Sequence, residues 1–230
     1  MKRMMSSMLS IQDVSFVYQG REGAHVAVSQ VNLEVKEGEF IAFIGPSGCG
    51  KSTLLNMLAG LLEPTEGQIL YKQKKIMGPS LERGVVFQNY SLFPWMTAQD
   101  NILLALKQVE AVNSMQALVK QAKELLAMVG LNGAEHKFPN QLSGGMQQRV
   151  ALARLFALDS PVFLMDEPFG AVDAAVRSNL QQCLIDLWEQ EEEAKTVVLV
   201  THDIDEAILL ADRIVVFTPG PGRIKRSEER

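Results

Sequence analysis

A short apolar run at 40–44 leads directly into the sequence Gly-Pro-Ser-Gly-Cys-Gly-Lys-Ser-Thr at 45–53. The order of glycines, lysine and serine matches the P-loop pattern, in which consecutive backbone N–H groups point into one concavity that holds phosphate oxygens. Residues 52–62 then have a helical pattern closed by Pro64 and Gly67. A helix that begins there directs its positive end at the same concavity. The sequence therefore predicts a buried strand, a phosphate-binding loop and a helix, the arrangement of an α/β fold.

Every residue of this loop is a candidate phosphate-binding residue. These are Gly45, Pro46, Ser47, Gly48, Cys49, Gly50, Lys51, Ser52 and Thr53. Lys51 would neutralise the β- and γ-phosphates of a nucleotide, and the Ser52 hydroxyl would ligate Mg²⁺. The alternative is a chance match without function, which the preceding strand and the following helix make less plausible.

Short strands and helices alternate along the rest of the chain. Strand patterns occur at 11–17, 31–35, 68–71, 84–87, 162–165, 197–200 and 214–217, and helical patterns cover 98–129, 144–158, 173–191 and 203–210. Such an alternation predicts a mainly parallel sheet with its ligands at the carboxyl ends of the strands.

The same pattern suggests the domain organisation. We expect a single domain over 9–224, with an α/β core at 9–88 and 159–218 and a mostly helical subdomain inserted at 89–158. A leader at 1–8 and a tail at 219–230, which is first Pro/Gly-rich and then charged, are expected to be loose. The acidic run at 189–193 is read as a solvated helix end. Because the chain ends soon after the last predicted strand, no C-terminal regulatory domain is expected.

Composition narrows the function classes. The net charge of −5 and the pI near 5.3 argue against a general nucleic-acid binder, which would normally have a basic surface. Cys49 and Cys183 lack the spacing of metal ligands and suit reduced thiols in a cytosolic compartment. The longest apolar runs, such as 196–201 and 207–211, are too short to span a bilayer. A membrane role would therefore require docking onto a partner that spans it.

Two carboxylates follow the apolar strand at 162–165. Asp166 would hold Mg²⁺, and Glu167 would polarise water for in-line attack on a γ-phosphate. The alternative is an ordinary solvated strand end.

Residues 142–149 read Leu-Ser-Gly-Gly-Met-Gln-Gln-Arg, which resembles the signature motif of the ABC transporter ATPases. The spacing from P-loop to signature to the paired carboxylates is also similar to theirs, and the resemblance covers about 9–224. Ser143, Gly144 and Gly145 open a predicted helix, so they offer a second anion site of N–H groups and a hydroxyl. The alternative is a plain helix cap. The resemblance implies a head-to-tail dimer in which each ATP lies between one P-loop and the partner's signature.

The resemblance also implies a fold and further site residues. The fold would be a P-loop NTPase (RecA-like) core with a mainly parallel sheet, an N-terminal antiparallel β portion and an inserted α-helical subdomain. Gln88 resembles the glutamine that reaches Mg²⁺ or the attacking water, and His202 resembles the histidine that contacts the γ-phosphate and supports Glu167. Asp173 resembles the D-loop residue at the dimer interface, although many relatives have Leu where this chain has Val172. Tyr18 resembles the aromatic residue that stacks on adenine.

Each of these residues has a simpler alternative. Gln88 and His202 could be structural polar residues after strands, and Asp173 could cap a helix, a role compatible with the first. Tyr18 could pack on the sheet, because the connection after it, at 19–26, is long and turn-rich at 19–24.

Two segments resemble the nitrate, sulfonate and taurine importers within the family. They are Ser-Leu-Phe-Pro-Trp-Met-Thr at 91–97 and Thr-Pro-Gly-Pro-Gly-Arg-Ile at 218–224. The side chains of Phe93 and Trp95, if exposed, would suit a surface that receives a helix of a membrane subunit; if buried, they would be core. Charges at Arg223, Lys225, Arg226 and Arg230 are read as a solvated tail, or as a contact to partner or lipid.

The expected function is therefore that of an ATP-hydrolysing importer subunit, with ATP and Mg²⁺ as cofactors. Its expected partners are a second ATPase subunit, transmembrane permease subunits and, indirectly, a solute-binding protein, with no nucleic acid. Its expected place is the cytoplasmic face of the cell membrane. Alternatives are a non-transport ABC ATPase of DNA repair or translation, and the motor of a multi-subunit exporter or cell-division complex.

Overall fold

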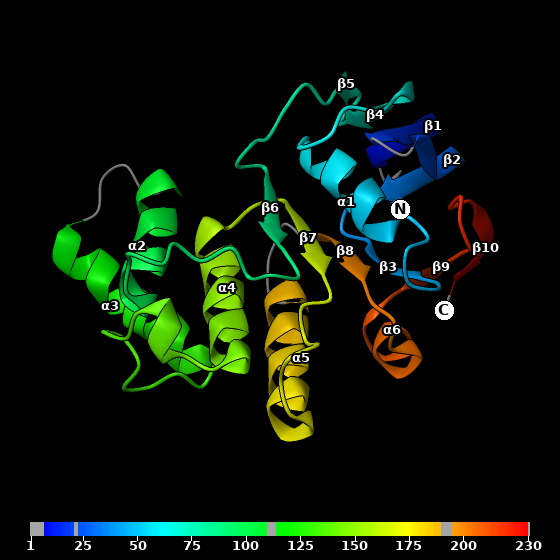
Figure 1. Ribbon diagram of the computed structural model, residues 1–230. Coiled ribbons are helices and arrows are strands. Elements are labelled where there is room, and N and C mark those ends of the chain that lie inside the picture. Colours follow the sequence, from blue (N-terminus) through cyan, green and yellow to red (C-terminus); the bar gives the residue numbers. More distant parts are fainter. Residues whose placement is uncertain (1–6, 21–22, 110–113, 190–194, 230) are drawn as a thin grey trace, which may run out of the picture. The chain divides into compact units, whose positions relative to one another are not determined.

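The computed structural model describes residues 7–20, 23–109, 114–189 and 195–229, which fall into two compact units (Figure 1). Unit 1 takes its residues from 1–83, 161–166 and 192–230, and unit 2 from 84–160 and 167–191. The sequence assigned 159–218, including the helical pattern at 173–191, to the α/β core. In the structure, helix α5 (Ala174–Glu189) instead belongs to the unit of the other large helices.

The larger sheet of unit 1 is mainly parallel, as predicted. It places β9 (Arg213–Phe217), β3 (Phe40–Ile44), β8 (Thr196–Val200) and β7 (Val162–Asp166) side by side. Every residue of β7 and β8 is buried, which explains their continuous apolar sequences. Unit 1 also contains helices α1 (Lys51–Ala59) and α6 (Ile204–Leu210).

A second sheet of unit 1 is antiparallel, in the order β2, β1, β4, β5. Its strands are β1 (Ser7–Gly20), β2 (Gly23–Lys36), β4 (Glu66–Tyr71) and β5 (Lys74–Lys75). The long β1–β2 ladder extends to Gly20 opposite Gly23, so the expected turn-rich connection at 19–24 is wrong for the described part of it. The expected antiparallel N-terminal portion is confirmed.

Both expected loose ends need correction. Ser7 and Met8 belong to β1, so the leader cannot extend to residue 8; residues 1–6 lie outside the described part of the chain. In the tail, β10 (Ile224–Glu229) pairs antiparallel with β9. Its side chains are mostly exposed and charged, which is typical of an edge strand. The strand therefore lacks the hydrophobic alternation by which it could have been predicted from the sequence. Positions 190–193 of the acidic run also lie outside the described residues.

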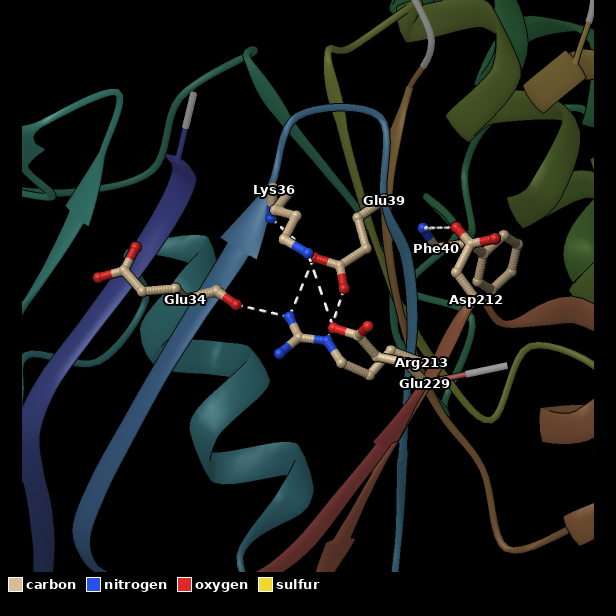
Figure 2. Close-up of polar contacts among 7 residues, drawn as sticks. All are labelled: Glu34, Lys36, Glu39, Phe40, Asp212, Arg213 and Glu229. Atoms are coloured by element: carbon tan, nitrogen blue, oxygen red, sulfur yellow. Dashed lines mark hydrogen bonds and ion pairs between the residues drawn. The ribbon is translucent and has the colours of Figure 1, made fainter. Parts of the chain in front are cut away.

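An almost fully buried ion pair fixes the start of β9 (Figure 2). The Arg213 guanidinium donates to both carboxylate oxygens of Glu39, with Nη2 3.0 Å from Oε2, and to the backbone carbonyl of Glu34. Glu39 also accepts from the backbone N–H of Lys36 at 2.7 Å. Asp212 accepts from the N–H of Phe40 at 2.9 Å. These contacts connect the end of β2, in the antiparallel sheet, to β3 and β9 of the parallel one.

Unit 2 is mostly helical. After β6 (Arg83–Val86), whose first residue still counts to unit 1, come α2 (Ala98–Val109), α3 (Met115–Met128), the 3₁₀ turn η1 (Pro139–Gln141), α4 (Gly144–Leu158) and α5. Helices α2, α3 and α4 pack against one another. The helix at 144–158 agrees with its prediction, whereas the pattern at 98–129 is divided between α2 and α3. Among the described residues, no helix combines the length and apolar character that crossing a membrane requires.

Candidate functional site

The shape of the P-loop between β3 and α1 requires glycine. Gly48 and Gly50 have φ values of +75° and +93°, in the region that side chains disfavour. A Cβ on Gly50 would lie only 2.4 Å from the carbonyl oxygen of Ala27 in β2, and one on Gly45 would lie 3.0 Å from Phe217. Close backbone packing therefore holds the loop.

The two polar side chains at the start of α1 point to different partners. Lys51 is buried, and its Nζ donates to the carbonyl oxygens of Gly45 and Pro46 at 2.7 and 3.0 Å, which places the ammonium over the loop. The hydroxyl of Ser52 donates to Oδ1 of Asp166, at the end of β7, at 3.0 Å. The structure thus brings together a hydroxyl and a carboxylate predicted from distant parts of the sequence.

Tyr18 lies beside the same helix. Its hydroxyl is 3.2 Å from Oγ1 of Thr53, and its ring packs edge-on against Phe16 with 4.8 Å between the centroids. The residue is nevertheless 43% exposed. It is therefore anchored next to the P-loop helix and keeps an accessible ring surface.

The ends of three parallel strands place His202 on the same edge of the sheet. Phe43 of β3 and Asp166 of β7 are both level with Val200 of β8, so the P-loop, Asp166 and the segment containing His202 leave the sheet at one edge. His202 is exposed, and Asp203 after it caps α6 by accepting from the N–H of Glu206 at 3.1 Å.

Glu167 and Gln88 contact each other within unit 2. The Gln88 amide Nε2 donates to Oε2 of Glu167 at 3.2 Å. Glu167 has a φ of +49°, a left-handed conformation that is unusual for a residue with a side chain. Its backbone carbonyl accepts from Nε2 of Gln148 at 2.9 Å. Gln148 lies inside the signature sequence, but its residue type alone gave no sign of this role.

The first turn of α4 is formed by the signature residues. Ser143 is the N-cap, and its hydroxyl accepts from the N–H of Met146 at 3.3 Å. Ser143 and Gly144 are exposed. Asp173 likewise caps α5, accepting from the N–H of Val176 at 3.0 Å. Both Ser143 and Asp173 therefore cap helices, as the simpler alternatives proposed. The N-terminus of α4 nevertheless stays accessible, because Ser143 and Gly144 are exposed.

The loop after Gln88 is fixed by two polar side chains, one buried and one half-buried. Asn101 of α2, fully buried, exchanges hydrogen bonds with the backbone of Phe93 and donates to the carbonyl of Thr97. Arg154 of α4 donates to the carbonyls of Ser91 and Tyr90 at 2.8 and 3.2 Å. Burial lowers the pKa of the Arg154 guanidinium from its usual value.

The two aromatic residues of this loop, Phe93 and Trp95, differ in their exposure to solvent. Trp95 is 69% exposed and Phe93 is half-buried, with 5.5 Å between the ring centroids. The core alternative is therefore wrong for Trp95.

The predicted site residues form two sets. Tyr18, the P-loop, Asp166 and His202 belong to unit 1, and Gln88, Ser143–Gly145, Glu167 and Asp173 belong to unit 2. Asp166 and Glu167 are consecutive, so the division between the units falls between them. Among the described residues, no group of three or more His, Cys, Asp or Glu side chains is arranged to hold a metal ion.

Comparisons with known proteins agree with the motifs. A family model described as "ABC transporter" matches residues 28–170. The nitrate import ATP-binding protein NrtD of Synechococcus elongatus is 50% identical over 199 residues, which are 86% of this chain and 72% of the relative. The bicarbonate transport ATP-binding protein CmpD of a Synechocystis species is 48% identical over 219 residues, which are 94% of this chain and 76% of the relative.

A solved structure confirms the predicted fold class. The dimeric ATP-binding cassette MJ0796, in a post-hydrolysis state bound to ADP and Pi, superposes with a TM-score of 0.87. It is 38% identical in sequence, and the match covers 96% of this chain and 98% of the other. By its motifs, its relatives and its fold, this chain belongs to the ABC transporter family as an ATP-binding cassette.

Proposed function

We propose that this chain is the ATP-binding and ATP-hydrolysing subunit that drives import of a small solute by an ABC transporter. The observation that carries the proposal is the hydrogen bond between Ser52 of the P-loop and Asp166, with Glu167 as the next residue. A phosphate cradle, a carboxylate for the associated cation and a carboxylate for the attacking water are then contributed by neighbouring points of the chain. The names of the relatives support import of an anion such as nitrate or bicarbonate.

In this proposal, the residues of unit 1 hold the nucleotide. The backbone N–H groups within 45–53, of which Pro46 has none, bind the phosphates. Lys51 moves its ammonium from the loop carbonyls onto the β- and γ-oxygens, and Tyr18 stacks on adenine. The hydroxyl of Ser52, the carboxylate of Asp166 and the amide of Gln88 suit Mg²⁺, a hard cation that prefers oxygen ligands. When bound, Mg²⁺ neutralises charge that develops on the transferred phosphoryl group.

The hydrolytic step is assigned to Glu167, Gln88 and His202. The Glu167 carboxylate accepts a hydrogen bond from the attacking water and takes up its proton as the bond to the γ-phosphorus forms. Gln88 orients the same water, and His202 donates to the γ-phosphate and supports Glu167. The leaving group is ADP.

The signature residues are proposed to complete the site of a second copy. Ser143 and Gly144 are exposed and Gly145 is half-buried at the start of a 15-residue helix, where N–H groups and the helix dipole favour an anion. Their ligand would be the γ-phosphate of the partner's ATP, with Asp173 at the interface. The dimeric form of the MJ0796 cassette supports this arrangement.

The transmembrane partner is proposed to dock on the loop that contains Phe93 and the exposed Trp95, at the cytoplasmic face of the cell membrane. A large exposed aromatic residue on a well-anchored loop is typical of the centre of an interface. The solute itself would be selected by the permease and a solute-binding protein.

Glu167→Gln tests the enzymatic assignment. We expect ATP hydrolysis to fall by more than about 100-fold while ATP binding persists, because the amide cannot take a proton from water. Size-exclusion chromatography with ATP should show accumulation of a dimer. Normal turnover would remove Glu167 from its proposed role.

Ser143→Arg tests the dimer. An arginine at the helix start should block closure on the partner's nucleotide and abolish turnover, while each monomer still binds ATP. Unchanged ATPase activity would contradict the shared site.

Transport is tested in cells that lack the chain. ATP-dependent uptake of nitrate or bicarbonate should be lost and should return with the wild-type chain but not with Glu167→Gln. Unchanged uptake of both anions, together with ATPase activity that nucleic acid stimulates without a membrane partner, would favour the non-transport alternative.

A further inference from the structure

The side chain of Gln148, in the second turn of α4, connects this helix to the segment that contains Glu167. It is 2% exposed. Its Nε2 donates to the carbonyl oxygen of Glu167 at 2.9 Å, and its Oε1 accepts from the N–H of Ala171 at 3.0 Å. A primary amide can donate and accept at once, so one side chain bridges both ends of the segment 167–171.

Glu167 needs such support, because its backbone conformation is unfavourable. Its φ of +49° lies in the left-handed region, where the Cβ of a residue with a side chain comes too close to the backbone. The next residue is Pro168, and a following proline normally restricts a residue to extended conformations. Such a conformation persists only where the surroundings impose it. The N–H of Gly170 donates a second, longer hydrogen bond to the Glu167 carbonyl oxygen, at 3.3 Å.

The signature helix approaches this segment closely enough for Gln148 to reach it. A Cβ on Gly145 would lie 2.8 Å from the carbonyl oxygen of Ala171 and 3.3 Å from Cγ1 of Val172. Gly145 therefore has a packing role within its own chain, in addition to its proposed contact with the partner's nucleotide. All of these residues belong to unit 2.

We propose that Gln148 is a positioning residue for Glu167: its amide fixes the left-handed backbone from which the Glu167 carboxylate reaches Gln88 and the attacking water. The inference rests on the proposed role of Glu167 in hydrolysis. A displacement of a reacting group by about 1 Å can lower a rate by about 100-fold, so loss of this bridge should affect turnover strongly.

Gln148→Met is the first test, because methionine preserves the length of the side chain and removes both hydrogen bonds. We expect kcat for ATP hydrolysis to fall by about 30-fold. The affinity for ATP, measured with a fluorescent analogue in EDTA, should change by less than about threefold, because the P-loop belongs to unit 1. Unchanged kcat would overturn the inference.

Gln147→Met is the matched control. The neighbouring amide donates to the carbonyls of Pro139 and Leu142, at 2.9 and 3.2 Å, and not to the segment 167–171. We expect this variant to lose comparable stability and to keep turnover within about threefold of wild type. Equal losses of kcat in both variants would overturn the inference, since any lost amide of α4 would then suffice.

A double-mutant cycle with Glu167→Gln separates this inference from the proposed function. If Gln148 acts through Glu167, Gln148→Met should lower the residual turnover of Glu167→Gln by less than about threefold. Full multiplication of the two losses would overturn the inference while leaving the role of Glu167 intact. Normal turnover of Glu167→Gln alone would instead overturn the proposed function.

Gln148→Glu gives a readout that a purely structural role would not change, and it covers the case in which Gln148→Met fails to fold. The ionised carboxylate can still accept from Ala171 but cannot donate to Glu167. Protonation restores an O–H donor, so turnover relative to wild type at the same pH should rise as the pH is lowered from about 8 to about 6. A constant ratio would overturn the inference.

Discussion

The P-loop of unit 1 and the Glu167 segment of unit 2 are held in unusual backbone conformations by different means. Main-chain atoms pack around the P-loop. The carbonyl oxygen of Ala27 accepts from the N–H of Gly222 at 2.9 Å, and it lies so close to Gly50 that a Cβ on Gly50 would not fit. A Cβ on Gly222 would in turn lie 1.9 Å from the carbonyl oxygen of Cys49. In unit 2, by contrast, the loops depend on the side chains of Gln148, Arg154 and Asn101.

This difference matches what each region has to do in the proposed mechanism. N–H groups that receive phosphate must have one fixed arrangement, and backbone packed on backbone provides it. A carboxylate and an amide that act on water depend on a few side-chain hydrogen bonds, each worth about 1 kcal/mol, so that small changes in α4 can alter their position. We therefore expect small added groups to damage the first region and loss of polar groups to damage the second.

The largest effect on stability is expected from Arg213→Met. Removal of the guanidinium leaves the buried Glu39 carboxylate without its ionic partner, which should cost about 3 kcal/mol or more of unfolding free energy. Below the unfolding transition, ATP affinity should stay within about twofold if main-chain packing alone shapes the P-loop. Urea denaturation and nucleotide titration measure the two quantities. The exposed Lys36–Glu229 pair supplies the control: Lys36→Met should cost less than about 0.5 kcal/mol. A loss of ATP affinity without a loss of stability would contradict the claim that main-chain packing alone shapes the P-loop.

Gly222→Ala tests the main-chain contacts of the P-loop directly. The added Cβ must displace either this segment or Cys49, so we expect ATP to bind about 30-fold more weakly, equivalent to about 2 kcal/mol. Equilibrium titration with ATP measures this change. At Gly220 a Cβ would meet only the carbonyl oxygen of Gly48, at 3.9 Å, so Gly220→Ala should bind ATP within about twofold of wild type. Similar ATP affinities of the two variants would contradict the proposed role of the main-chain contacts between Gly222 and the P-loop.

Arg154→Met tests the side-chain contacts of unit 2. Tyr90 and Ser91, whose carbonyls Arg154 binds, have φ values of +62° and +46°. Without the guanidinium we expect this loop, two residues after Gln88, to relax and kcat to fall about tenfold with little change in ATP affinity. Steady-state kinetics would show the split. Arg154→Lys should recover part of the loss, because one ammonium cannot serve both carbonyls as the fork of arginine does. A loss of ATP affinity larger than the loss of kcat would contradict the assignment.

The smallest effect on the isolated chain is expected from Trp95→Ala. Because this side chain is 69% exposed, its truncation should change the free energy of unfolding by less than about 0.5 kcal/mol and leave basal ATP hydrolysis unchanged. Retention of the chain on permease-containing membranes should decrease. A large fall in melting temperature would show that Trp95 contributes to folding after all.

The fold and the motif residues could largely be predicted from the sequence, because glycine, strand and carboxylate patterns are local. The Ser52–Asp166 contact follows from strand ends that share one edge of a parallel sheet. The strand β10 could not be predicted, because an edge strand of charged residues lacks hydrophobic alternation.

The roles of Gln148 and Arg154 were also beyond the sequence. A buried glutamine or arginine on a helix has the same local pattern whether it contacts the 167–171 segment, the loop after Gln88 or water. Which backbone group the side chain contacts depends on how α4 packs, and the hydrophobic periodicity of the sequence does not predict that contact.

The junction of Ala27, Cys49 and Gly222 has a practical consequence for mutagenesis. Its atoms of contact are carbonyl oxygens and an amide, so truncating side chains at 27 or 49 leaves the contacts in place. A conventional alanine scan would pass over the junction at both positions, because residue 27 is already alanine and Cys49 contributes its backbone carbonyl oxygen. Its strength would show when a Cβ is added at Gly222, or when the backbone itself is altered, for example by an ester in place of the amide at 222.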